Sequence, residues 1–294
     1  MARVAVVGVG AIGATVAAAV QDAGGHELVL CARRPLDGVV VERPGGEEVV
    51  LQAPVMTEPD GIGAAEWVVL AVKAHQTNGA AGWLRVLAGP GATIAVLQNG
   101  IDHLERVTPL AGGAAVLPTV NWCPVEPVAA GRVRQRGALR LAVPDGSAGE
   151  AFAALLGDGA EVAVGGDFAR EAWRKLCANA VSGVMALAGR PAEIFALDDL
   201  RSVATALAHE CAAVARAEGA PLSDDDADEV IAWIRELPPD AGSSILTDRL
   251  AGRELEWEAR NEVIGRLGRR HGIATPVSDT VAALLHAASG CEAG

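Results

Sequence analysis

Lysine is almost absent from this chain of 294 residues, since Lys73 and Lys175 are the only two among its 24 lysines and arginines. Because the chain uses arginine almost everywhere, we expect arginine at any position that needs only a positive charge. A desolvated lysine gives up its proton near neutral pH, whereas arginine stays protonated. The two lysines are therefore candidates for a chemical role that arginine cannot fill. Tyrosine is missing altogether, which we interpret as compositional bias without functional meaning.

Other absences exclude whole classes of protein. No apolar run is long enough to cross a bilayer, and glycines interrupt the N-terminus where a secretory signal would carry a basic segment and a cleavage site. We therefore expect a soluble, cytoplasmic protein. The net charge of −13 argues against a nucleic-acid or anionic-membrane partner. At 51% hydrophobic residues, the chain is long enough for two domains with a large core.

The cysteines form no recognisable framework. Their number is odd, their spacing is wide, and no CxxC or paired-histidine pattern accompanies them, so neither disulfides nor a zinc site is indicated. We expect mostly small buried side chains at Cys31, Cys123, Cys177, Cys211 and Cys291. The acidic cluster at residues 224–226 follows Ser223 and is interpreted as helix-start electrostatics. No metal site is predicted.

The N-terminal residues carry a dinucleotide-binding fingerprint. A β-branched run over residues 4–7 leads into Gly-Val-Gly-Ala-Ile-Gly and then into a helix-compatible stretch ending near residue 23. In this context Gly8 permits the tight turn, Gly10 lets the backbone approach a pyrophosphate, and Gly13 lets the helix pack on the strand. The free N–H groups at the helix start suit phosphates. The predicted cofactor-binding loop is Gly8, Val9, Gly10, Ala11, Ile12 and Gly13.

The end of the second predicted strand, residues 26–31, selects between the two nicotinamide cofactors. An acidic residue there would hold a ribose hydroxyl and repel a 2′-phosphate. This chain has Arg33 and Arg34 instead, and guanidinium groups suit bidentate phosphate contacts. NADP(H) is therefore predicted in preference to NAD(H). The alternative is a pair of solvated arginines in a loop.

Two later strands, residues 66–72 and 92–97, are followed by Lys73 and by Gln98-Asn99-Gly100. Ligands of open α/β sheets bind beyond the carboxyl ends of the strands. Lys73 is therefore expected beside the cofactor, and an amide of the second segment is expected on the nicotinamide or ribose. The alternative for the second segment is an ordinary Asn-Gly turn.

From about residue 167 onward the pattern is helical. Within residues 171–187, Lys175, Asn179 and Ser182 recur at helical spacing, which predicts a polar strip on an otherwise buried helix. The alternative is a lysine that reaches out to solvent.

Further polar residues lie in helices expected later in the chain. Ser243 and Ser244 open a helix, and their hydroxyls would suit a carboxylate, although plain capping explains a serine pair equally well. Glu256 falls in an amphipathic helix expected over residues 252–264 with the apolar stripe Leu255, Ala259, Val263 and Leu267. From spacing alone, Glu256 and Arg260 are interpreted as a surface pair.

These motifs resemble the ketopantoate reductases (2-dehydropantoate 2-reductases) over nearly the whole chain. The motifs that carry the resemblance are Gly8-x-Gly10-Ala-Ile-Gly13, Val72-Lys73-Ala, Gln98-Asn99-Gly100, Trp173-Arg-Lys175-Leu-x-x-Asn179-Ala, Ser243-Ser244-Ile-Leu with Gly252-Arg-x-x-Glu256, and His271-Gly-Ile-x-Thr-Pro276. The resemblance implies an α/β Rossmann domain over residues 1–166, an all-helical substrate and catalytic domain over residues 167–294, and an active site in the cleft between them.

The resemblance also implies an activity and residue roles. NADPH would reduce a 2-oxo acid, most directly ketopantoate to pantoate in pantothenate biosynthesis, with Lys175 as proton donor and Glu256 near the reacting centre. Glu256 thereby becomes a predicted site residue rather than part of a surface pair. The implied substrate-binding residues are Lys175, Asn179, Ser244 and Asn99, and the cofactor-binding residues beyond the glycine loop are Arg33, Arg34, Lys73, Asn99 and Glu256.

Two departures from the family pattern leave the substrate open. Gly183 and Glu193 stand where relatives that reduce ketopantoate commonly carry asparagines, and each unmet buried polar group costs about 1 to 3 kcal/mol. One alternative is a different 2-oxo acid or an imine, with Gly183 opening room for a bulkier group. A lesser alternative is an NADP(H)-sensing protein without turnover. The assembly is left open, with a homodimer as one option.

Overall fold

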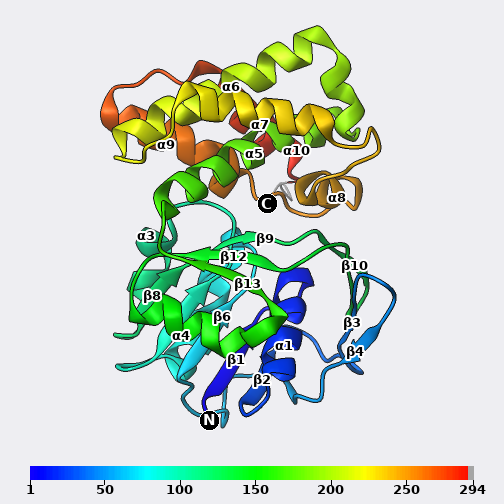
Figure 1. Ribbon diagram of the computed structural model, residues 1–294, viewed down its shortest axis with the longest axis vertical. Helices are drawn as coiled ribbons and strands as arrows, with labels where there is room; N and C mark the ends of the chain where they lie inside the picture. Colours follow the sequence, from blue (N-terminus) through cyan, green and yellow to red (C-terminus); the bar gives the residue numbers. More distant parts are fainter. Residues whose placement is uncertain (291–294) are drawn as a thin grey trace. The chain divides into compact units, whose positions relative to one another are not determined.

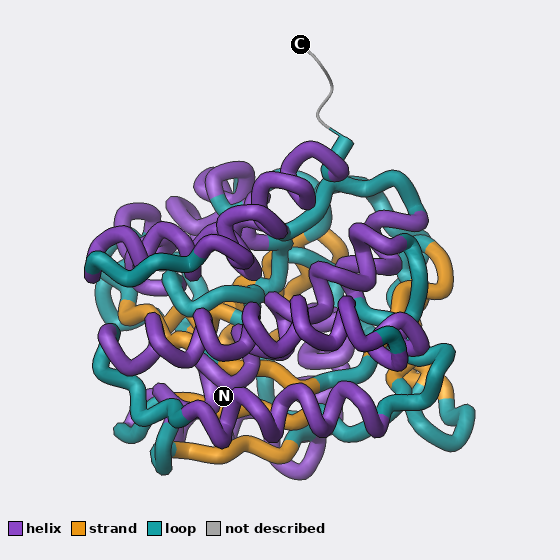
Figure 2. The backbone as a smooth tube through the Cα atoms, turned by 90° about the horizontal axis from the view of Figure 1, so that it is seen from above, coloured by secondary structure: helices purple, strands orange, loops and turns teal. Residues whose placement is uncertain are grey.

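The computed structural model describes residues 1–290 and separates into two compact units. The first holds Met1–Gln98 and Asp102–Phe168, and the second holds Asn99–Ile101 with the residues from Ala169 onward. All strands of the described residues (orange in Figure 2) belong to the first unit, and the second is helical. The predicted fold class, a Rossmann unit followed by a helical unit, is confirmed.

The first unit is built around a six-stranded parallel sheet with the order β5-β2-β1-β6-β7-β8. Its strands are β1 (Arg3–Val7), β2 (Glu27–Cys31), β5 (Val55–Met56), β6 (Trp67–Leu70), β7 (Thr93–Val96) and β8 (Ala115–Pro118). These runs are largely apolar, as expected for strands covered on both faces. Along β1, Val4 and Val6 enter one hydrophobic cluster while Ala5 and Val7 enter the other, in the alternation of a pleated strand.

Helices cover the two faces of this sheet (Figure 1). They are α1 (Ala11–Ala23), α2 (Ala81–Leu87), α3 (His103–Val107) and α4 (Ser147–Leu156), with 3-10 turns at Ala74–Gln76, Asn78–Ala80, Thr108–Leu110 and Gly157–Gly159. One hydrophobic cluster includes Val16 of α1 and Phe152 of α4, and the other includes Leu84 of α2. The sheet is therefore held between two apolar layers, which leaves its strand ends for function.

Two smaller sheets complete the first unit, in the orders β10-β11-β3-β4 and β13-β12-β9. Their strands are β3 (Val40–Glu42), β4 (Glu48–Val50), β9 (Val120–Trp122), β10 (Val125–Ala129), β11 (Arg132–Gln135), β12 (Arg140–Val143) and β13 (Glu161–Val164). The Arg134 Nε donates to Glu42 Oε1 over 2.8 Å across neighbouring strands. That ion pair joins β11 to β3.

The second unit is a helical bundle. Its helices are α5 (Phe168–Ala188), α6 (Asp198–Ala217), α7 (Asp224–Glu236), α8 (Ser244–Leu250), α9 (Val263–His271) and α10 (Pro276–Ala288), with a 3-10 turn at Ala192–Ala196 and a π-helical turn at Glu258–Glu262. Helix α6 contacts α7, α9 and α10. The Glu210 carboxylate of α6 accepts the backbone N–H groups of Val277 (2.9 Å) and Ser278 (2.7 Å), which ties down the start of α10.

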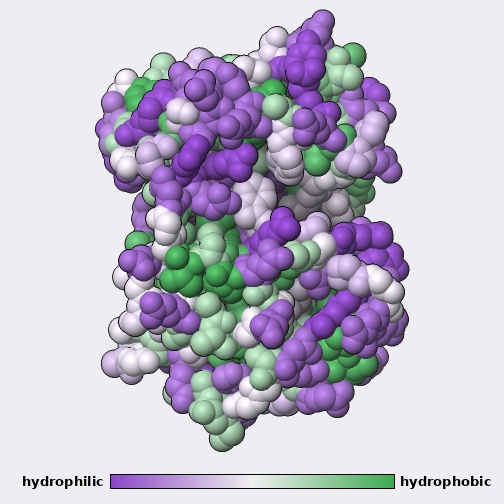
Figure 3. Space-filling model, viewed as in Figure 1, coloured by the Kyte–Doolittle hydropathy of each residue, from purple (hydrophilic) through white to green (hydrophobic). Residues whose placement is uncertain are grey.

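The acidic start of α7 is a cap, as the sequence indicated. The Ser223 Oγ accepts the Asp226 N–H, and the Asp226 carboxylate accepts the Ser223 N–H over 2.8 Å. No group of three or more His, Cys, Asp or Glu side chains within residues 1–290 is arranged to hold a metal ion. In the same part of the chain, no helix has the length and apolarity that a membrane span requires. Figure 3 shows polar and apolar residues interspersed on the visible face of each unit.

The helix predicted over residues 252–264 begins later, at Trp257. Gly252 adopts a left-handed φ of 64° just after α8 ends, and the chain runs without helical structure through Glu256. Leu255 is nevertheless buried, and its N–H donates to the Ser289 Oγ over 2.8 Å. The apolar spacing thus identified the buried face correctly but not the start of the helix.

Three cysteines, Cys31, Cys177 and Cys211, are buried thiols, which agrees with the expectation of small core side chains. Cys123 is half-buried, and Cys291 lies outside the described residues. Burial raises the pKa of the Cys31 thiol to about 12, so this thiol stays protonated and unreactive at neutral pH.

Candidate active site

The glycine loop has the geometry that its fingerprint predicts. A Cβ on Gly8 would lie 2.6 Å from the Val72 backbone nitrogen, and a Cβ on Gly13 would lie 2.0 Å from the Gly8 carbonyl oxygen. A Cβ on Gly10 would meet no atom within 4 Å. Gly8 and Gly13 are therefore required for the turn to pack, whereas Gly10 borders open space at the N-terminus of α1. These residues fit a dinucleotide pyrophosphate.

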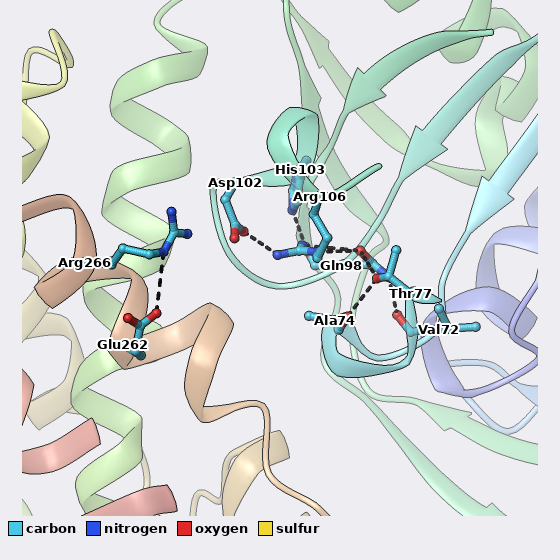
Figure 4. A network of polar contacts seen from close by, with 9 residues as sticks. All are labelled: Val72, Ala74, Thr77, Gln98, Asp102, His103, Arg106, Glu262 and Arg266. Carbon is cyan, nitrogen blue, oxygen red and sulfur yellow. Dashed lines mark hydrogen bonds and ion pairs between the residues drawn. The ribbon is translucent and has the colours of Figure 1, made fainter. Parts of the chain in front are cut away.

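A network of polar contacts joins the segments that follow β6 and β7 (Figure 4). The Gln98 Nε2 donates to the Val72 carbonyl over 3.1 Å and to the Thr77 Oγ1 over 2.9 Å. The Arg106 Nε donates to the Gln98 Oε1 over 3.3 Å, and the His103 Nε2 lies 2.9 Å from the Gln98 carbonyl oxygen. The Gln98 amide is thus committed to structure, and it holds in place the loop that carries Lys73.

The two arginines predicted to select NADP(H) follow β2 directly. Cys31 and Ala32 are buried, and Arg33 and Arg34 are exposed. Lys73, three residues after the end of β6, is half-buried. All three cationic side chains therefore follow strands of the parallel sheet at its carboxyl edge, where ligands of such sheets bind.

The second unit contains a chain of amide and carboxylate hydrogen bonds. The Asn179 Nδ2 on α5 donates to the Asn99 Oδ1 over 3.2 Å, and the Asn99 Nδ2 donates to the Glu256 Oε2 over 3.0 Å. Asn179 and Glu256 are 6% and 4% exposed. Lys175, half-buried, precedes Asn179 by one turn of α5. The structure thus brings together three residues that the family resemblance assigned to the site.

Arg260, which sequence reasoning placed on the surface, is 2% exposed and lies in the middle of the π-helical turn. Its Nη1 donates to the Ser244 Oγ over 3.0 Å, and its Nη2 donates to the Ser182 Oγ over 2.7 Å. Burial lowers the pKa of Arg260, and the carboxylates of Glu256 and Asp248 oppose that shift. The interpretation of Glu256 and Arg260 as a surface pair is wrong, because both side chains are buried.

A signal for this burial was available. Glu256 and Arg260 continue at four-residue spacing into Ile264, an apolar and fully buried residue. Because Ile264 is an apolar residue on the same helix face, the spacing indicates that Glu256 and Arg260 also face the interior.

The position of Gly183 is filled by the protein itself. A Cβ there would lie 2.9 Å from the Leu285 Cδ1 and 3.1 Å from the Asn261 Oδ1. The expectation that Gly183 opens room for a bulkier substrate is therefore wrong. Glu193, the second departure, is exposed and accepts the Arg190 Nη2 over 2.9 Å, so it takes no part in the buried polar group.

Comparison with known proteins covers both units. Residues 4–148 match the family model described as "Ketopantoate reductase PanE/ApbA". Residues 167–289 match the model described as "Ketopantoate reductase PanE/ApbA C terminal". The 2-dehydropantoate 2-reductase of Mycobacterium tuberculosis is 46% identical over 288 residues, which are 97% of each chain.

Solved structures show the same arrangement of elements. The 2-dehydropantoate 2-reductase of Geobacter metallireducens matches with a TM-score of 0.89 at 26% identity, over 97% of this chain and 99% of that one. A dimeric ketopantoate reductase from Staphylococcus aureus matches with a TM-score of 0.87 at 24% identity, over 98% of each chain. At that identity the second likeness concerns the fold alone.

Proposed function

The chain belongs to the ketopantoate reductase family, and from this premise we propose that it reduces the C2 carbonyl of a 2-oxo acid with NADPH, most directly 2-dehydropantoate to pantoate. One observation supports the proposal above others. The family resemblance assigns Asn99, Asn179 and Glu256 to substrate, cofactor and catalysis, and in the helical unit Asn99 is hydrogen-bonded to both of the others. The proposed setting is pantothenate biosynthesis in the cytoplasm.

The proposed cofactor contacts follow from the residues at the strand ends. The loop of Gly8, Val9, Gly10, Ala11, Ile12 and Gly13 holds the pyrophosphate with backbone N–H groups. Arg33 and Arg34 bind the 2′-phosphate through charge-assisted hydrogen bonds. Lys73, Asn99 and Glu256 bind the nicotinamide riboside part.

In the proposed reaction, bound NADPH supplies a hydride to the carbonyl carbon. Lys175 donates a proton to the carbonyl oxygen as negative charge develops there, so its ammonium group both stabilises that charge and removes it. An amide nitrogen carries two donors. Asn179 uses one of them on Asn99 and retains one for a substrate oxygen. Glu256 orients Asn99 by accepting its amide N–H, and Ser244 donates to the substrate carboxylate.

We also propose a homodimer as the assembly, because a relative of the same fold from Staphylococcus aureus is described as dimeric. Sedimentation of the purified protein across a range of concentrations measures this directly. A single species of about twice the chain mass of 29.9 kDa is expected.

A steady-state assay of NADPH oxidation tests the proposed function. Ketopantoate is compared with 2-oxoisovalerate, pyruvate and a cyclic imine, and NADH replaces NADPH in a parallel series. The proposal expects the highest kcat/KM with ketopantoate and NADPH. A higher kcat/KM with another 2-oxo acid or with the imine would reassign the substrate, and cofactor binding without turnover of any compound would refute the proposal.

A further inference from the structure

The most unusual side chain in the second unit is Arg260, because a guanidinium is rarely withdrawn from water so completely. Moving an unpaired charge into a protein interior is strongly unfavourable, so such groups persist where specific partners hold them. Arg260 is 2% exposed, and its Nε has no hydrogen-bond partner among the described residues. It also occupies a π-helical turn, a local distortion that is frequent at functional sites.

The contact between Arg260 and Ser244 determines what Ser244 can do. The guanidinium Nη1 donates to the Ser244 Oγ over 3.0 Å, so the serine oxygen acts as the acceptor in that contact. The hydroxyl proton is then the part of Ser244 that points to another partner. Because Ser244 is exposed, it presents a polarised O–H donor to solvent or to a ligand.

Capping of α8 does not account for Ser244. The residue before it, Ser243, is the N-cap, and the Ser243 Oγ accepts the Leu246 N–H over 3.3 Å. The plain capping role that the sequence left open for the serine pair is therefore filled by Ser243 alone. Ser244 is held by Arg260 instead.

The other side of the guanidinium is anchored to the helix that carries the proposed substrate residues. The Ser182 Oγ accepts from the Arg260 Nη2 over 2.7 Å and donates to the Asn179 carbonyl over 2.8 Å. The hydroxyl of Ser182 is thus used in both directions. Through it, Arg260 joins the turn of α5 that holds Asn179 to the start of α8.

The carboxylates around Arg260 would disfavour the binding of an anionic ligand if its positive charge were absent. Glu256 and Asp248 both interact electrostatically with Arg260, and Asp248 is also paired with Arg253 over 2.9 Å. Buried carboxylates alone would repel a substrate carboxylate. A fixed buried guanidinium offsets them at short range, where the low local polarity strengthens the effect.

We propose that Arg260 is a positioning residue for substrate specificity: it fixes Ser244 as a hydrogen-bond donor toward the carboxylate of a 2-oxo or 2-hydroxy acid and supplies the buried positive charge that favours an anion there. The inference rests on the proposed function for the identity of the substrate. On this proposal, the contact between Arg260 and Ser244 is the reason that the site binds a carboxylic acid more tightly than the neutral ester of that acid.

Arg260→Met removes the charge and the donors while keeping a long side chain, and Arg260→Lys keeps the charge but loses the planar fork. Arg269→Met is the matched control, because Arg269 is an exposed arginine of α9 paired with Asp279. Calorimetry on the NADP-bound protein measures the Kd of pantoate and of its methyl ester. Steady-state assays measure kcat and KM for ketopantoate and its methyl ester.

Arg260→Met should raise the Kd of pantoate about tenfold or more, the scale of a hydrogen bond to a charged group. The Kd of the methyl ester should change less than about threefold, and the Kd of NADPH should not change. Arg260→Lys should recover part of the preference for the acid. Ser244→Ala should show the same loss, with little added loss in the double variant, because the two residues act as a unit.

An unchanged ratio of acid to ester affinity in Arg260→Met overturns the inference. If that variant does not fold, the same ratio in Ser244→Ala and Arg260→Lys decides it. Failure of the proposed function is seen separately, as a wild-type protein that binds NADPH but does not turn over ketopantoate. A wild-type protein that binds the methyl ester as tightly as pantoate overturns the inference whatever its turnover.

Discussion

The Asn99 Nδ2 donates to the Glu256 Oε2 over 3.0 Å, although the two residues are 157 positions apart in the chain. Asn99 follows a strand of the parallel sheet, and Glu256 directly precedes the helical segment that holds Arg260. Glu256 also interacts electrostatically with Arg260. The Glu256 carboxylate therefore interacts both with the Asn99 amide, which is proposed to bind cofactor and substrate, and with the buried Arg260 guanidinium.

A double-mutant cycle on Glu256 and Arg260 measures that dependence. Glu256→Gln leaves Arg260 as a buried charge with less compensation, so it should lower the free energy of unfolding by about 1 to 3 kcal/mol. Combined with Arg260→Met, the same substitution should cost less, with an interaction energy of about 1 kcal/mol or more. Urea unfolding of the four proteins gives these values. Additive effects would mean that the two groups are not coupled.

The two glycines that flank the start of α1 should respond differently to a methyl group. Gly13→Ala places a Cβ 2.0 Å from the Gly8 carbonyl oxygen, so it should lower the unfolding free energy by about 3 kcal/mol or more. Gly10→Ala meets no atom within 4 Å, so it should keep wild-type stability and weaken NADPH binding about tenfold or more by occupying the space proposed for the pyrophosphate. Thermal unfolding and NADPH fluorescence separate the two effects. Wild-type NADPH affinity in Gly10→Ala would contradict the assigned site.

Selection of NADPH is tested at Arg33 and Arg34. Replacing both by alanine should raise the Kd of NADPH by roughly 10-fold to 100-fold, the range for hydrogen bonds to a charged group, and leave the Kd of NADH nearly unchanged. Arg136→Ala is the control, because that arginine is exposed and paired with Glu126. Equal losses for both cofactors would mean that the arginines do not bind the 2′-phosphate.

The cap of α7 provides a test by pH. Burial alone would raise the pKa of Asp226, but hydrogen bonds from Arg170 and Ser223 outweigh it and lower the pKa to about 2. A pKa that is lower in the folded state stabilises the fold above the unfolded value of about 3.9, and this stabilisation is lost as the pH falls toward about 2. The contribution at neutral pH is about 1 to 2 kcal/mol, discounted because the Arg170 side chain is 48% exposed.

Asp226→Asn should therefore be less stable than the wild type at neutral pH by that amount, and the difference should shrink between about pH 4 and about pH 2. Urea unfolding at a series of pH values gives the curve. A difference that stays constant across this range would show that the ionised carboxylate is not what the cap requires.

The sheet unit was largely predictable because its constraints are local. The turn at Gly8 and the close approach at Gly13 involve residues near in sequence or a neighbouring strand, and α1 ends at Ala23 as its pattern predicted. The strands are short apolar runs bounded by polar or glycine residues, which a single sequence displays plainly. The boundary predicted at residue 166 also rested on a local signal, the change from strand-like to helical patterns. By contacts, the second unit begins at Ala169 and also includes Asn99–Ile101.

The surroundings of Arg260 and Gly183 could not be predicted in this way. The spacing of Glu256 and Arg260 before Ile264 indicates burial, but it does not show that Ser182 and Ser244 arrive from other helices to accept from Arg260. The space beside Gly183 is likewise filled by Leu285 and Asn261, residues from distant parts of the chain. Spacing indicates which residues share a helix face but not which distant residues meet them.

The role of Lys175 as proton donor is tested by kcat and by the Kd of NADPH in Lys175→Met, measured beside the wild type with ketopantoate as substrate. We predict a kcat lower by about 100-fold to 10,000-fold, the range for loss of a general acid, with the Kd of NADPH within about twofold of the wild-type value. Lys175→Arg should not restore kcat, because an arginine does not release its proton. Wild-type kcat in Lys175→Met would contradict the assignment of this lysine as the proton donor.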